Sequence, residues 1–246
     1  MTSAVIDEAV ETADEIERKI QEFFDKVNDV ISWVPWPFDD LIEPIEQGMA
    51  QLREKMQEFW DRLTDFLTNR GDPDKLKQFA DEWRESIGNR IGEIAGDIKL
   101  TQMRSNIEWE GRAAEAYKTI VPPQSEGLEG IKSLAVQINT SLKSLANGIE
   151  DFWTAILIAF GTFVVAIAAA IIGAVTVVGI PAAIVAVLVA VGACVALIAT
   201  AITSRDAVED TIKAEQDTIA QGTHDIGTQW TKSKTSMSDP GDWEAR

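Results

Sequence analysis

The side chains that most often perform catalysis or bind metals are scarce in this chain. Cysteine and histidine each occur once, as Cys194 and His224, and the two lie apart in the sequence. A catalytic triad needs a histidine beside its Ser or Cys, and a zinc site needs several closely spaced Cys or His ligands. The chain also lacks a glycine-rich loop of the kind that binds phosphates. We therefore expect no catalytic residue, no metal site, no cofactor and no small-molecule substrate.

Cys194 and the many carboxylates have simpler explanations than chemistry. Cys194 sits among Ala, Val and Leu, so we expect a small buried apolar side chain. The 40 Asp and Glu residues fall on the outward faces of the expected helices, as they do on a solvated surface. The net charge of -18 repels phosphate. This charge argues against nucleic-acid binding, and it leaves apolar burial as the means of any membrane contact.

The elements that carry these residues are expected to be helices, because Leu, Ile, Ala, Glu, Asp and Lys dominate the sequence. Residues 1–70 predict an amphipathic helical hairpin, since apolar positions recur in alternating steps of three and four. The proline-containing segment Trp33–Phe38 separates its helices, and Asp39 or Asp40 can cap the second. Asn69-Arg70-Gly71 ends that helix. The apolar positions are Ile6, Ala9, Ala13, Ile16, Ile20, Phe23, Val27, Val30 and Val34, then Ile42, Ile45, Met49, Leu52, Met56, Phe59, Leu63 and Phe66.

Residues 71–151 predict a second helical hairpin. Asp72-Pro73 is a helix start signal, with a capping carboxylate before a proline. The first helix is expected to run to about Ile107, and Trp109-Glu110-Gly111 forms the turn. The apolar seam of this first helix is expected at Leu76, Ala80, Trp83, Ile87, Ile91, Ile94 and Ile98. The second helix follows, and Val121-Pro122-Pro123 should break or kink it. Its apolar seam continues at Leu128, Ile131, Ala135, Ile138, Leu142, Leu145, Ile149 and Phe152.

This second hairpin resembles the WXG100 family of small helical-hairpin proteins that type VII secretion systems export. The likeness covers about Asp72 to Phe152, and it rests on a Trp-x-Gly turn followed by the alanine-rich helix start Arg112–Tyr117. The resemblance implies pairing with a helical partner protein or with a second copy. It also implies that the partner or the secretion machinery recognises Trp109, Gly111 and Tyr117.

The export tag commonly associated with such systems is a tyrosine followed four residues later by an acidic residue. The only tyrosine, Tyr117, is followed at that spacing by Val121. The resemblance therefore implies that a partner chain carries the tag, or that this chain stays associated with the cell. Met1 to Val10 does not resemble a classical signal peptide. We expect secretion by a non-classical, type VII route, or membrane association.

From Phe152 to Ser204 the chain contains no Asp, Glu, Lys, Arg or His. A turn expected at Val177–Pro181 divides this segment into two arms of about 20 apolar residues, roughly 30 Å of helix each, which matches a bilayer's hydrocarbon core. Trp153 and Arg205, at its two ends, are expected at a membrane interface. The membrane lipid would then be a partner of this hairpin.

Three arrangements would hide this uncharged hairpin from water. It could span a membrane constitutively as two helices, lie sequestered in a soluble form that inserts later, or form the centre of a soluble bundle. Burying one Val, Leu or Ile gains about 1.5–3 kcal/mol, so leaving the hairpin exposed would be costly. The composition of the arms is compatible with all three arrangements.

Residues 205–246 complete the chain as an amphipathic helix and a polar tail that begins near Ser236. The sequence as a whole predicts an all-α protein, with long helical hairpins in an elongated bundle or coiled coil and the uncharged hairpin at 152–204. The leading functional interpretation is a non-enzymatic type VII secretion-associated protein that pairs through helices and engages or inserts in a membrane. The alternatives are an autonomous α-helical pore-forming toxin and a structural helical-bundle subunit.

Overall fold

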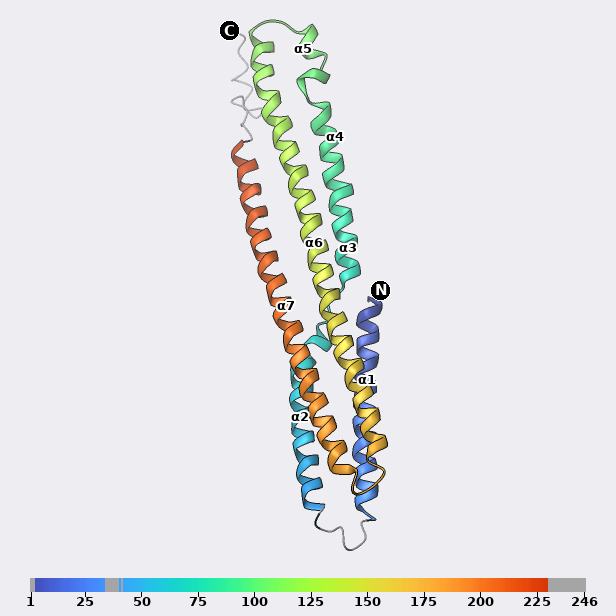
Figure 1. Cartoon of the computed structure of the whole chain (residues 1–246). Coiled ribbons are helices and arrows are strands. Elements are labelled where there is room, and N and C mark those ends of the chain that lie inside the picture. Colours follow the sequence, from blue (N-terminus) through green and yellow to red (C-terminus); the bar gives the residue numbers. More distant parts are fainter. Residues whose placement is uncertain (1–2, 34–39, 41, 230–246) are drawn as a thin grey trace. The chain divides into compact units, whose positions relative to one another are not determined.

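The computed structural model describes residues 3–33, 40 and 42–229, and every regular element in this part of the chain is a helix (Figure 1). The predicted all-α fold is confirmed. The proline-containing break at 34–39 and the polar tail from Ser236 lie outside the described residues. The elements are α1 (Ala4–Ile31), α2 (Ile42–Thr68), α3 (Pro73–Glu82), the π-helix η2 (Trp83–Asn89), α4 (Arg90–Asp97), the 3-10 helix η3 (Leu100–Gln102), α5 (Ser105–Glu108), α6 (Arg112–Gly173) and α7 (Ile180–Gln229).

The described chain divides into two compact units. Unit 1 comprises the described residues of Met1–Asp74 together with Leu145–Asp210. Unit 2 comprises Lys75–Ser144 together with the described residues from Thr211 onward. The long helices α6 and α7 each contribute one stretch to unit 1 and another to unit 2. The uncharged hairpin therefore belongs to the same unit as α1 and α2.

The core of unit 1 is built from α1, α2 and the inner faces of the uncharged hairpin. Both predicted seams are confirmed over the described residues, because Ile6 to Val27 on α1 and Ile45 to Leu63 on α2 are buried at the expected steps. These seams meet a buried stripe on the hairpin, where the Phe59 ring lies 5.9 Å from the Phe160 ring and 5.7 Å from that of Phe163. Apolar packing of this kind holds α1 and α2 against the hairpin.

Helix α2 approaches the return arm of the hairpin closely, and a glycine makes this possible. A Cβ atom at Gly48 would lie 2.9 Å from Cγ2 of Ile184. Between α6 and α7, just below the hairpin, a Cβ atom at Gly148 would lie 2.7 Å from Cγ1 of Val208. Contacts this short force neighbouring groups apart, so these two glycines set the helix spacing in unit 1.

The predicted stop and start signals between the first two hairpins are confirmed. Helix α2 ends at Thr68, and Gly71 adopts a φ of 77°. Only glycine adopts this backbone conformation without steric cost. Helix α3 then begins at Pro73, directly after Asp72. The local sequence is sufficient to turn the chain here.

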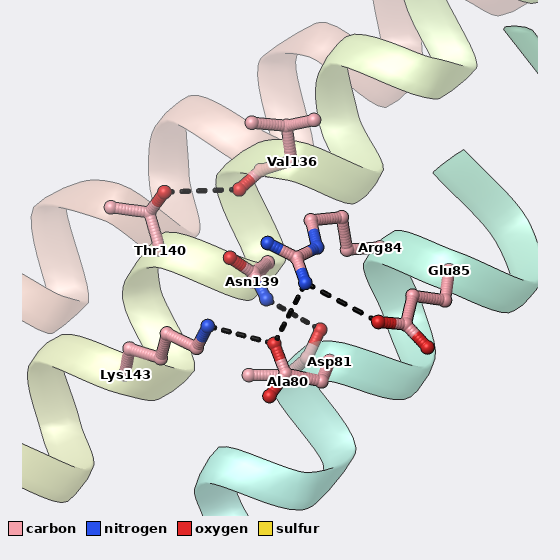
Figure 2. A network of polar contacts seen from close by, with 8 residues as sticks. All are labelled: Ala80, Asp81, Arg84, Glu85, Val136, Asn139, Thr140 and Lys143. Atoms are coloured by element: carbon pink, nitrogen blue, oxygen red, sulfur yellow. Dashed lines mark hydrogen bonds and ion pairs between the residues drawn. The ribbon is translucent and has the colours of Figure 1, made fainter. Parts of the chain in front are cut away.

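Unit 2 holds α3 and α4 against α6 through buried polar contacts, and Figure 2 shows the contact to α3. Nδ2 of Asn139, on α6, donates to the carbonyl oxygen of Ala80 on α3 at 2.6 Å. Oγ of Ser125, further toward the start of α6, donates to the carbonyl oxygen of Ala95 on α4 at 2.9 Å. Because both polar side chains are buried, these hydrogen bonds fix the register between the two paired segments.

The first helix of the second hairpin is shorter than the sequence predicted. Regular helix ends at Asp97 rather than at about Ile107, and η3 and α5 follow as short turns. The π-helix η2 also widens the helix and changes which side chains face inward. Trp83 and Ile94 are 38% and 49% exposed, although the pattern placed both in a buried seam. Gly96, in the last turn of α4, is a poor helix former and favours an early end.

The sequence predicted a break or a kink at Pro122-Pro123; the break is wrong, and the kink stays a prediction. Helix α6 runs unbroken from Arg112 to Gly173 with both prolines inside it. An internal proline removes a backbone hydrogen bond and costs about 3 kcal/mol. Packing on either side of the pair outweighs this cost, because Val121 is buried and Ser125 bonds to α4. Helix α7 likewise continues without interruption past Arg205.

Candidate functional site

The Trp-x-Gly turn lies in unit 2, between α5 and α6. Gly111 adopts a φ of 106°, a conformation that side chains disfavour. No atom lies within 4 Å of the position that a Cβ at Gly111 would take, so backbone conformation rather than crowding requires the glycine. The carbonyl oxygen of Gly111 accepts a hydrogen bond from the Glu115 N–H at 3.0 Å. Gly111 thus reverses the chain and starts α6.

The turn brings Trp109 and Tyr117 into contact. Their ring centroids lie 5.6 Å apart at an interplanar angle of 54°. The Tyr117 hydroxyl donates to Sδ of Met103 at 3.4 Å. Trp109 remains 42% exposed, which leaves a rigid aromatic pair at the surface of unit 2. Half-exposed Trp and Tyr side chains are enriched in protein interfaces, so this pair is suited to contact a partner.

The uncharged segment forms a helical hairpin within unit 1, and its turn at residues 174–179 overlaps the predicted Val177–Pro181 but begins and ends earlier. Helix α6 ends at Gly173 and α7 begins at Ile180. Gly179 N–H donates to the Thr176 carbonyl oxygen at 3.0 Å, which closes the turn. Both arms are long and apolar enough to cross a membrane, by length and composition alone. In each arm, 33% of the most apolar 18-residue window is buried.

The two faces of this hairpin have different surroundings. The inner face packs against α1 and α2, and its fully buried members include Ile156, Phe163, Val187 and Val191. The outer face is exposed although it carries no charged side chain, and its polar members are hydroxyl residues such as Thr162 and Thr200. The exposed large side chains of this face and of the turn are Ile158 (63%), Val165 (70%), Ile172 (74%), Val175 (58%), Val178 (67%), Val185 (58%), Val189 (67%) and Leu197 (47%). We call these eight residues the outer apolar face.

Comparison with known families covers both features in one match. A family model described as a WXG100-like domain matches residues 51–202. The chain belongs to the WXG100-like family. The match confirms the resemblance drawn from Trp109 and Gly111, and it extends beyond Asp72–Phe152 into α2 and through nearly all of the uncharged hairpin. No curated protein and no solved structure matches this WXG100-like chain.

Membership indicates a helical protein of the type VII secretion group, a group whose members are typically non-enzymatic. The matched range includes part of α2, which covers the inner face of the hairpin, together with both hairpin arms. The WXG100-like region is therefore not confined to the Trp-x-Gly hairpin. It includes the apolar core of unit 1.

Trp153 lies at the base of the uncharged hairpin, inside unit 1. It is 2% exposed, and its Nε1 donates to the Arg70 carbonyl oxygen at 2.9 Å. Its ring meets that of Phe152 edge-on, with centroids 5.6 Å apart. The indole N–H is therefore satisfied within the protein. Its predicted role as an interfacial anchor stays a prediction, and serving it would require Trp153 to leave this contact.

Arg205 follows the return arm of the hairpin, so it also lies at the base of the hairpin and in unit 1. Its guanidinium carbon lies 5.3 Å from the centroid of the Phe66 ring, and Nη2 lies 3.9 Å from Oε2 of Glu209. Arg205 and Trp153 line one groove, together with Arg70. Arg70 was not among the predicted site residues. The one sequence signal that pointed to Arg70 was its position directly before Gly71, which ends the helix in a left-handed conformation.

The ionic contacts that shift a pKa lie outside the uncharged hairpin. The Lys143 ammonium donates to Oδ1 of Asp81 at 2.7 Å, and this hydrogen bond holds the pKa of Asp81 below its usual value. Hydrogen bonds from Lys55 and Arg62 likewise lower the pKa of Glu58. Both carboxylates are surface partners of cations. Within the described residues, no group of three or more His, Cys, Asp or Glu side chains is arranged to hold a metal ion.

Proposed function

We propose that this WXG100-like protein is a non-enzymatic component of a type VII secretion pathway that pairs through its helices and engages a membrane with the outer apolar face. One observation carries the proposal. The inner face of an uncharged hairpin is covered by α1 and α2, while its outer face remains apolar and exposed. Soluble monomers rarely leave a large contiguous apolar patch in water, and such patches mark membrane or protein contacts.

Lipid is the contact that the composition of this face favours. No charged residue occurs between Phe152 and Ser204, so a bilayer core would not have to desolvate an ionic group. The arms are roughly as long as a hydrocarbon core is thick, about 30 Å. The chain carries a net charge of -18, so electrostatic attraction to anionic lipid contributes little. Apolar transfer supplies the binding energy.

Helical pairing is supported by unit 2. Trp109 contacts Tyr117 at its surface, and Phe79 and Trp83 on the paired helix are 52% and 38% exposed. Exposed aromatic side chains on a helix suit the groove of another helical protein or of a second copy. In this proposal the aromatic pair contacts the partner or the secretion machinery, and Gly111 shapes the turn that presents it. Export then follows a type VII route, alone or with the partner.

Vesicle flotation of the purified full-length chain, prepared without detergent, tests the membrane half of the proposal. The wild-type chain is expected to float with phosphatidylcholine vesicles. The double variant Val165→Asp/Val189→Asp should stay at the bottom of the gradient, because it places two carboxylates on the outer apolar face. The matched control Gln51→Asp/Gln57→Asp adds the same charge at exposed positions of α2 and should float. A wild-type chain that ignores vesicles across pH would exclude membrane engagement and favour a structural bundle subunit.

A second candidate is an autonomous pore-forming toxin. The observation in its favour is that amphipathic helices α1 and α2 cover one face of the hairpin, as a releasable cover would in a soluble form. If the purified chain releases a trapped dye from vesicles, and the Val165→Asp/Val189→Asp variant does not, this candidate gains support. Full retention of dye by vesicles that carry bound protein argues against it.

A further inference from the structure

Two adjoining grooves lie at the base of the uncharged hairpin in unit 1. The larger has a volume of about 710 Å³ and lies among the end of α2, the loop after it, α6 and α7. The smaller, about 420 Å³, runs between the two arms toward the outer apolar face. The residues that line both grooves are Gly148, Phe152, Arg205 and Val208. The two grooves are therefore parts of one depression, which we call the basal groove.

The larger part of the basal groove carries charges of both signs. Arg70 and Arg205 line it, as do the carboxylates of Asp65 and Glu209. Arg70 is oriented by its Nε, which donates to the Leu67 carbonyl oxygen at 2.7 Å. Arg205 is held over the Phe66 ring, as described above. Paired guanidinium groups suit a phosphate, and carboxylates suit an ammonium group.

The smaller part of the basal groove is largely apolar, although Asp151, Thr200 and Ser204 also line it. Ala155 and Ile158 line it from one arm, and Leu197 and Ala201 line it from the other. Ile158 and Leu197 also belong to the outer apolar face. The basal groove thus leads from a charged end to a surface without charge. An amphiphile shows the same change along its length, from a polar head to an apolar acyl chain.

We propose that the basal groove binds one phospholipid with a zwitterionic headgroup. Its phosphate lies between Arg70 and Arg205, its ammonium group lies beside Asp65 or Glu209, and an acyl chain follows Ile158 and Leu197. This inference rests on the proposed membrane function and names the lipid class that the site prefers. A second copy is a poorer occupant, because its own outer apolar face has no charged group to offer these four ionic side chains.

Titration of the full-length chain with dihexanoyl-phosphatidylethanolamine, below its micellar concentration, tests the proposal. Binding followed by calorimetry is expected to be saturable and tighter than that of dihexanoyl-phosphatidylglycerol or dihexanoylglycerol. The Arg70→Gln/Arg205→Gln variant should bind about tenfold more weakly, because a charge-assisted contact to phosphate is lost. The control Arg18→Gln/Arg62→Gln removes the same charge from exposed sites and should bind as the wild type does. Arg70→Gln alone, a loop substitution, covers the case in which Arg205→Gln fails to fold.

The outcomes separate this inference from the proposed function. If the wild type floats with vesicles but binds the three short-chain lipids equally, or if both arginine variants bind like the wild type, the headgroup site is wrong and membrane engagement stands. A dimer that forms with increasing concentration and blocks lipid binding also overturns the site, in favour of a second copy. Failure of the wild type to float overturns the membrane function itself.

Discussion

Asn139 shows what a single polar side chain contributes inside unit 2. Its amide is 8% exposed and bonds to the Ala80 carbonyl oxygen, just before α3 widens into η2. We expect Asn139→Ala to lower the free energy of unfolding by about 1–3 kcal/mol, because a buried carbonyl loses its donor. Urea unfolding followed by circular dichroism measures the change. The neighbouring Thr140→Ala, which removes an exposed hydroxyl, should change it little, and equal losses in the two variants would contradict the assignment.

The contact between Asp81 and Lys143 in unit 2 should make the stability of the protein depend on pH. The hydrogen bond from Lys143 lowers its folded pKa below the ordinary value of 3.8. A depressed pKa means that the stabilisation is present above pH 3.8 and is lost as pH falls through the lower, folded value. Asp81→Asn should therefore lower the melting temperature at pH 7 and have progressively less effect as the pH falls below 3.8. Melting curves of both proteins between pH 2.5 and 7 test this; a difference that persists undiminished in acid would point to packing instead.

Some residue roles could be predicted from the sequence and others could not. The buried seam positions followed from spacing, since a helix places residues three and four apart on one face. The turn at Gly111 and the position of Trp109 in it were predicted from the Trp-x-Gly sequence. Asn139 and Ser125 were missed because a polar residue in a helix is usually solvated, and only the tertiary fold supplies the carbonyl that each one meets.

At the scale of elements, Gly48 controls how closely α2 packs on the hairpin. Gly48→Ala should destabilise the protein, because the new methyl group would meet Ile184 and overpacking costs about 1–3 kcal/mol. Gly192→Ala, also in a helix but with no atom within 4 Å of its Cβ position, should stabilise by roughly 0.5–1 kcal/mol through helix propensity. Thermal or urea unfolding of the two variants tests the opposite signs. Stabilisation by both substitutions would show that α2 is free to shift.

Element types were predictable, whereas element ends were less so. Helix, turn and hairpin assignments followed from periodicity and from glycine or proline signals. Pro122-Pro123 did not break α6 because long-range packing outweighed a local preference. The π-helix η2 carries no recognised sequence signal, and its extra width moved Trp83 out of the expected seam. Contacts between segments that are distant in the sequence decide such details.

In the molecule as a whole, the fold of unit 1 covers one face of the uncharged hairpin with two helices whose other faces are acidic. Helices α1 and α2 turn their apolar seams toward the hairpin, and their charged residues face outward. Unit 1 is therefore amphipathic as a body, with an acidic side and an apolar side. The sequence predicted the hairpin and the seams, but it could not show that they pack on each other, because apolar patterns carry no information about their partner.

Cys194 reports whether this packing opens. It is 2% exposed on the inner face of α7, and no other cysteine occurs in the chain. We expect a water-soluble maleimide to label it slowly in buffer and rapidly in denaturing urea, because reaction requires α1 and α2 to separate from the hairpin. If the bundle docks on lipid without opening, vesicles should leave the slow rate unchanged. Rapid labelling in native buffer would contradict the packing of unit 1.

Fluorescence at single labelled positions tests whether the outer apolar face contacts lipid. In a Cys194→Ala background, an environment-sensitive dye is attached through Val165→Cys on the outer apolar face, or through Gln57→Cys on the exposed side of α2. Adding phosphatidylcholine vesicles should shift the emission of the dye at position 165 to shorter wavelength and leave that at position 57 unchanged. Unchanged emission at position 165, with vesicles in excess, would contradict the claim that this face meets lipid.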